Sequence, residues 1–179
     1  NAYKQIGDTI AATVLRPRLI FSVDGSSGTT EPADTTCLFS EDQIILDDPN
    51  GTQIFNSGAD DTTSSVQNIG FSFRFKGVDY SYYTVSSNGL IGLGSTPVPS
   101  NASNVLASLT TPTLAPFWDD LILGQYPVLV QSGGQPNARF LHITWRGRIK
   151  NIDTNSQPSI TIHAILEEAT QSVRYVYSY

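Results

Sequence analysis

The sequence contains few charged residues, and little of that charge is positive. Charged residues make up 15% of the 179-residue chain, and the formal net charge is −6. A typical soluble domain has about a quarter of its residues charged. Nucleic-acid-binding proteins need a basic face to displace counterions, but the ten Lys and Arg residues are scattered along the chain. We therefore expect no nucleic-acid partner, and the many hydroxyl and amide side chains suit a surface outside the cell.

Cysteine, methionine and long hydrophobic runs are also scarce. The single cysteine, Cys37, cannot form an internal disulfide, and its neighbours supply no basic group to activate it, so we interpret it as a structural thiol. No hydrophobic run approaches the roughly 20 residues of a membrane-spanning helix, which argues against membrane insertion. Because the chain has no methionine, we expect a processed protein or a fragment, and processing is consistent with secretion.

Catalytic motifs are lacking as well. The two histidines, His142 and His163, each lie mid-strand opposite an aliphatic stripe, so we expect exposed or partly buried sheet residues. Zinc would need more ligands than these and Cys37, and no Gly-x-Ser-x-Gly elbow presents a nucleophile. Glu167 and Glu168 are adjacent on one strand and therefore face opposite sides, so they do not form a glycosidase pair by themselves. We expect no enzyme and no cofactor other than calcium, which is considered below.

The sequence does contain a series of short alternating segments. Runs rich in Val, Ile, Tyr, Phe and Thr are separated by Gly, Pro, Asn and Asp, which is typical of half-buried antiparallel strands. Asn88-Gly89 divides two such runs and is a strong hairpin signal. The predicted strands are 9–15, 19–23, 43–46, 53–55, 71–75, 82–86, 90–93, 128–131, 139–146, 159–167 and 172–179, with a short helical turn around 104–107. This pattern predicts an all-β antiparallel β-sandwich, jelly-roll-like or Ig-like, with little or no helix, formed by residues 1–179 as a single domain.

An ordered series of motifs runs through the second part of the chain. In order, these motifs are 70–75 (GFSFRF), 85–91 (VSSNGLI), 114–121 (LAPFWDDL), 143–146 (ITWR) and 173–177 (VRYVY). The series resembles the extracellular β-sandwich modules of large surface proteins from type IX-secreting bacteria. It is also similar, more distantly, to the nidogen-type extracellular domain. The resemblance covers residues 69–179 and implies an extracellular protein without catalytic residues, whereas residues 1–68 match no pattern and are assigned to N-terminal strands.

Two sets of side chains are candidate binding sites. Asp119 and Asp120 are paired carboxylates, which suit calcium because that ion takes about six to eight oxygen ligands. The alternative is that one of them caps a turn by accepting a backbone N–H. Tyr80, Tyr82 and Tyr83 belong to an excess of tyrosines, and an exposed aromatic stripe is able to stack on sugar rings or pack against a protein. Aromatic residues also simply favour strands.

Several residues fit acceptor patterns for glycosylation. Asn50 and Asn101 begin Asn-x-Ser/Thr sequences, which are N-glycan acceptors. The resemblance implies O-glycosylation at Thr9, Thr35 and Thr62, each of which follows an aspartate.

Two functions remain open at this point. The first is a non-catalytic extracellular structural or adhesive surface protein whose partners are copies of itself or other surface proteins. In its sharper form, residues 6–15 add as a strand to a neighbour's sheet, and head-to-tail repetition builds a filament. The alternative is a carbohydrate-binding module of a secreted multidomain protein, with glycans as partners.

Overall fold

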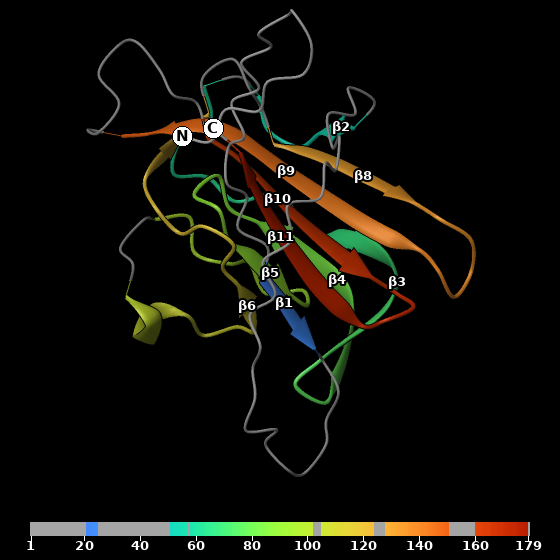
Figure 1. Cartoon of the computed structure of the whole chain (residues 1–179). Coiled ribbons are helices and arrows are strands. Elements are labelled where there is room, and N and C mark those ends of the chain that lie inside the picture. Colours follow the sequence, from blue (N-terminus) through green and yellow to red (C-terminus); the bar gives the residue numbers. More distant parts are fainter. Residues whose placement is uncertain are drawn as a thin grey trace, which may run out of the picture.

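The structure is a computed structural model that describes residues 21–24, 51–56, 58–101, 105–123, 128–150 and 160–178, the first of these as backbone only. One group of strands comprises β1 (Phe21–Asp24), β2 (Thr52–Gln53), β7 (Leu121–Ile122), β8 (Leu129–Gly133), β9 (Phe140–Ile149), β10 (Ile160–Glu167) and β11 (Ser172–Ser178). The other comprises β3 (Gln67–Phe75), β4 (Val78–Val85), β5 (Ile91–Leu93) and β6 (Thr113–Leu114). The first group forms a seven-stranded sheet in which six strands follow the order β1-β11-β10-β9-β8-β2 and the short strand β7 also pairs with β9. The second group forms a four-stranded sheet in the order β3-β4-β5-β6 (Figure 1).

The apolar faces of the two sheets meet in one core. Leu141, Ile143 and Trp145 alternate along β9 and are at most 1% exposed, and Phe71 and Phe73 of the opposite sheet belong to the same cluster. Burying a side chain of this size stabilises the fold by about 1.5–3 kcal/mol, so these alternating faces hold the two sheets together. The predicted all-β antiparallel sandwich is thereby confirmed.

Most differences from the predicted elements concern very short ones. The strands β6 and β7 were not predicted, because two residues are too few to display an alternating pattern. The predicted helical turn is a 3₁₀ turn, η1 (Leu106–Ser108). Predicted strand 19–23 overlaps β1, whereas predicted strands 9–15 and 43–46 lie outside the described residues. Within the described part of the chain, no helix is long and apolar enough to cross a membrane.

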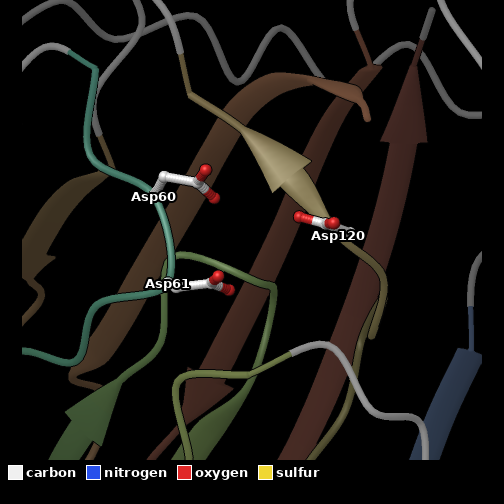
Figure 2. Close-up of side chains that lie close together, drawn as sticks. All are labelled: Asp60, Asp61 and Asp120. Carbon is white, nitrogen blue, oxygen red and sulfur yellow. The ribbon is translucent and has the colours of Figure 1, made fainter. Parts of the chain in front are cut away.

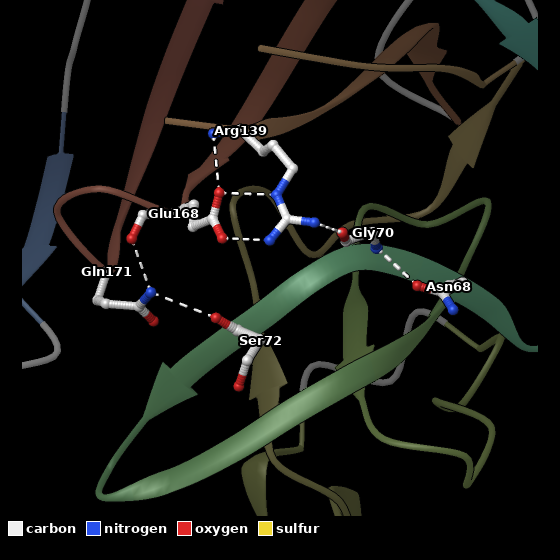
Figure 3. Close-up of polar contacts among 6 residues, drawn as sticks. All are labelled: Asn68, Gly70, Ser72, Arg139, Glu168 and Gln171. Atoms are coloured by element: carbon white, nitrogen blue, oxygen red, sulfur yellow. Dashed lines mark hydrogen bonds and ion pairs between the residues drawn. The ribbon is translucent and has the colours of Figure 1, made fainter. Parts of the chain in front are cut away.

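The edge strand β3 is capped by a side chain from the opposite sheet. Gln171 lies in the turn between β10 and β11, and its Nε2 donates to the Ser72 carbonyl at 3.3 Å (Figure 3). Its Oε1 accepts the backbone N–H of Arg74. One amide therefore satisfies both a donor and an acceptor of β3, as a neighbouring strand would.

An ion pair reinforces this cap. Arg139, directly before β9, pairs side by side with the carboxylate of Glu168, and its Nη1 also donates to the Gly70 carbonyl of β3 (Figure 3). The hydrogen bonds from the Arg139 side chain lower the pKa of Glu168 from 4.5 to about 2. We call Arg139, Glu168 and Gln171 the edge clasp, because together they fasten β3 to the seven-stranded sheet.

Candidate functional site

The two motifs 85–91 and 114–121 meet at Asn88, whose side chain is fully buried. Its Oδ1 accepts the backbone N–H of Leu121 at 2.9 Å. Its Nδ2 donates to Asp61 Oδ1 at 2.8 Å and to the Ser100 carbonyl at 2.7 Å. Buried polar groups are costly unless they are paired, and Asn88 is paired on both sides. The two motifs therefore share a structural role, and we call their contact at Asn88 the Asn88 joint.

Gly89 fits into the Asn88 joint because it has no side chain. Its φ is +80°, and a Cβ at this position would lie 1.7 Å from the Phe117 carbonyl oxygen. Any other residue would force the two motifs apart. The predicted Asn88-Gly89 turn is confirmed, since Val85 pairs with Ile91 across it.

Three carboxylates gather next to Asn88. Carboxylate oxygens of Asp60, Asp61 and Asp120 all lie within 4.8 Å of one another (Figure 2). The first two precede β3, whereas Asp120 directly precedes β7, so the fold brings together residues distant in sequence. Lys150 lies beside them, with its Nζ 3.4 Å from Asp60 Oδ2 and 3.4 Å from Asp120 Oδ2. We call Asp60, Asp61 and Asp120 the acidic cluster.

The acidic cluster includes one of the two predicted calcium ligands. Asp120 belongs to it, whereas Asp119 instead accepts the backbone N–H of Asp120 through its Oδ1 at 2.8 Å. The Oδ1 atom of Asp120 is buried and has no hydrogen-bond donor among the described residues. Hydrogen bonds to Asp120 and Asp60 raise the pKa of Lys150, so a cationic side chain balances part of the charge. Three carboxylates are fewer than the about six to eight oxygens that calcium takes, and calcium binding stays a prediction.

The three predicted ligand-binding tyrosines do not share one surface. Tyr83 is 2% exposed in the core, and this burial raises its pKa to about 12. Tyr80 packs against the same core, whereas Tyr82 is 49% exposed. Tyr82 and Tyr83 are adjacent on β4 and therefore face opposite sides of the sheet. The pairing of β3 with β4 is irregular between Asn68, opposite Tyr82, and Phe73, opposite Tyr80. Of the three, Tyr82 alone presents a largely exposed ring.

Two predicted glycosylation residues lie among the described residues. Asn101 is exposed, and its carbonyl accepts the indole N–H of Trp118 at 3.1 Å. Thr62 is partly buried, and its backbone N–H donates to Ser87 Oγ at 3.0 Å. The remaining predicted acceptors lie outside the described residues: Thr9, Thr35 and Asn50.

The histidines are more buried than the sequence suggested. His142 is 6% and His163 2% exposed, so the expectation of exposed or partly buried residues was wrong. His142 Nε2 lies 3.0 Å from His163 Nδ1, and Thr144 Oγ1 lies 3.1 Å from each of these nitrogens. Adjacent strands bring the three side chains together, and this mutual pairing makes burial of their polar atoms tolerable.

A cavity of about 380 Å³ lies on the face of the seven-stranded sheet that carries His142, opposite the core. Its lining residues come from β8 to β11 and the adjoining turns: Gln131, Ala138, Arg139, Phe140, His142, Ile165, Glu167, Ala169 and Arg174. The two adjacent glutamates make separate ion pairs, since Glu167 pairs with Arg174 at 3.2 Å while Glu168 belongs to the edge clasp. Sequence reasoning missed this cavity because its lining residues are dispersed over four strands.

Comparison with protein-family models gave a match. A family model described as NIDO related matches residues 40–179, which is well over half of the chain. No curated protein and no solved structure matches the chain. The family match agrees with the nidogen-like part of the resemblance.

Proposed function

The chain belongs to the NIDO-related family, and on this basis we propose that it is a non-catalytic extracellular domain that acts by adhesion and self-assembly at a bacterial surface. Domains of this family are typically extracellular. The low charge and the abundance of hydroxyl and amide side chains support the same location. Type IX secretion is part of the proposal, and it rests on the motif series alone.

The self-assembly proposal is based on one observation: the sheet edges differ in how well they are protected from pairing with another strand. Among the described strands, the edge strands β2 and β6 are two residues long, and β3 is capped by the edge clasp. Short or covered edges resist pairing with another chain. The remaining edge ends in β1, which pairs with β11 from Phe21 opposite Tyr175 to Asp24 opposite Ser172. This edge is the one best suited to receive a further strand.

The added strand would come from the N-terminal part of a second copy. The segment 6–15 contains the predicted strand 9–15 and lies outside the described residues. In the proposed assembly, residues 6–15 of one copy pair with the sheet edge that ends in β1 of the next copy. Main-chain hydrogen bonds between the two strands provide the affinity. Because donor and acceptor surfaces differ, the contact is head-to-tail and generates a filament unless the rotation closes into a ring.

The test compares the full chain with a variant lacking residues 1–15. We expect polymers of the full chain by electron microscopy and light scattering, and a folded monomer after the deletion. A synthetic peptide of residues 1–15 should bind the shortened chain at one site, whereas a scrambled peptide should not. Polymers that persist after the deletion would contradict assembly through this strand, and a monomeric full chain would contradict self-assembly altogether.

A further inference from the structure

The cavity opposite the core has a regular floor made of two cross-strand rows. In the first row, Gln131, His142, Ile165 and Arg174 follow one another across β8, β9, β10 and β11. In the second row, Gly133, Phe140 and Glu167 follow one another across β8, β9 and β10. Directly opposed residues of neighbouring strands have their side chains on the same face. The floor is therefore set by strand register, which makes it more rigid than a site built on loops.

Phe140 is the aromatic part of this floor. A Cβ added to Gly133 would lie 2.9 Å from both Cε1 and Cζ of the Phe140 ring, so the ring rests against the bare backbone of β8. The ring is partly exposed, and Ile165 extends the apolar surface from the neighbouring row. Glycine at this position thus allows an aromatic ring to lie low against the sheet.

The charges around the cavity are balanced. Arg174 pairs with Glu167 at 3.2 Å, and Arg139 pairs with Glu168 within the edge clasp. The carboxylate of Glu167 also accepts the Thr170 hydroxyl at 3.0 Å. Since each cation has its own carboxylate, the cavity offers hydrogen-bond donors and acceptors without a strong net charge. An ionic ligand would gain little here, whereas a neutral ligand with several hydroxyl groups matches the lining.

We propose that this cavity binds a neutral pyranose sugar, as a monosaccharide or as the end of a glycan chain. The volume of about 380 Å³ is at the small end of the range of ligand sites, which is about 300–1,000 Å³. The apolar C–H face of the sugar packs on Phe140, and its hydroxyl groups reach Glu167 and Arg174 at the wall. The Arg174 side chain is 36% and the Glu167 side chain 32% exposed, so both groups are accessible to a ligand in the cavity. This inference rests on the proposed adhesive function and names its ligand class.

The test uses methyl glycosides of glucose, galactose, mannose, fucose and N-acetylglucosamine, followed by a glycan array. Binding is measured by calorimetry and by chemical-shift changes at the backbone amides of His142 and Ile165. We expect at least one glycoside to bind and to shift these amides. Phe140→Ala should weaken that binding at least tenfold, and Glu167→Gln should weaken it severalfold.

Tyr82→Ala is the matched control, because it removes an exposed aromatic ring from the other sheet. It should change the affinity less than twofold. If Phe140→Ala does not fold, Gly133→Ala replaces it, since the new methyl group displaces the Phe140 ring. The proposal is overturned if no sugar binds, or if Tyr82→Ala weakens binding while the cavity variants do not. If the chain polymerises but binds no sugar, the sugar-binding proposal fails and the self-assembly proposal is retained. The failure of one proposal can therefore be distinguished from the failure of the other.

Discussion

The two ends of β9 are joined to the opposite sheet in different ways. Near its last residue, Ile149, the connection is made by Asn88, a fully buried amide that forms neutral hydrogen bonds with the backbone N–H of Leu121, which pairs with Ile149, and with the Ser100 carbonyl. Before its first residue, the connection is made by the edge clasp, whose ion pair is part-buried, with the Arg139 side chain 38% and the Glu168 side chain 12% exposed. Buried neutral hydrogen bonds depend little on salt, whereas the stability contributed by a part-buried ion pair depends on pH and on ionic strength. The first connection should therefore respond little to solution conditions, whereas the second should weaken at low pH and at high salt.

The largest expected effect comes from comparing Gly89, next to Asn88, with Gly77 in the turn between β3 and β4. Gly89 and Gly77 both have φ of +80°, but a Cβ at Gly77 would meet no atom within 4 Å. Gly77→Ala should therefore cost only the backbone strain, about 1–2 kcal/mol. Gly89→Ala adds a collision with the Phe117 carbonyl and should cost more than about 4 kcal/mol or prevent folding. Chemical denaturation of both variants measures the difference, and equal costs would refute a rigid joint at Asn88 and Gly89.

The edge clasp should give a smaller effect that depends on pH. Because the folded-state pKa of Glu168 is about 2 and its ordinary value is 4.5, its contribution to stability is present above pH 4.5 and is lost as the pH falls toward 2. Glu168→Gln should therefore lower the free energy of unfolding most at neutral pH. The difference in the free energy of unfolding between Glu168→Gln and the wild type should disappear as the pH falls by about two units below 4.5.

Denaturation curves at pH 7, 4.5 and 3 test this expectation, and added salt should narrow the difference at pH 7. Asp79→Asn is a suitable control, because its ion pair with Arg74 is more than half exposed on both sides and should matter little. A difference that stays constant across the pH range would show that the Arg139–Glu168 pair does not stabilise the fold.

The smallest effect is expected at the acidic cluster. Lys150→Met removes the cation between Asp60 and Asp120 and leaves three carboxylates to attract calcium. Millimolar calcium should then raise the Tm of this variant by about 2–4 °C, and that of the wild type by less. Sodium chloride of equal ionic strength is the control. The calcium interpretation fails if Asp120→Asn, introduced into the Lys150→Met chain, leaves the calcium response unchanged.

The sequence predicted the parts of this structure that depend on local periodicity. Alternation along 139–146 and 159–167 identified β9 and β10, and the turn at Asn88-Gly89 was correct. It did not predict which strand faces would be covered, so the burial of His142 and His163 was missed. Nor did it reveal that Asp120 would meet Asp60, because that contact depends on the packing of segments far apart in the chain. Local pattern determines strands, whereas sites arise from register and topology.

The cap on β3 also bears on the direction of the proposed assembly. With one amide, Gln171 occupies both a donor and an acceptor of that strand, so this side is closed to incoming chains. A fibre built by strand addition at the other edge would have all its subunits pointing the same way, and its two ends would be chemically unlike. One end would display a vacant acceptor edge and the other a free donor strand. A cell would then be able to anchor such a fibre at one end while lengthening it at the other.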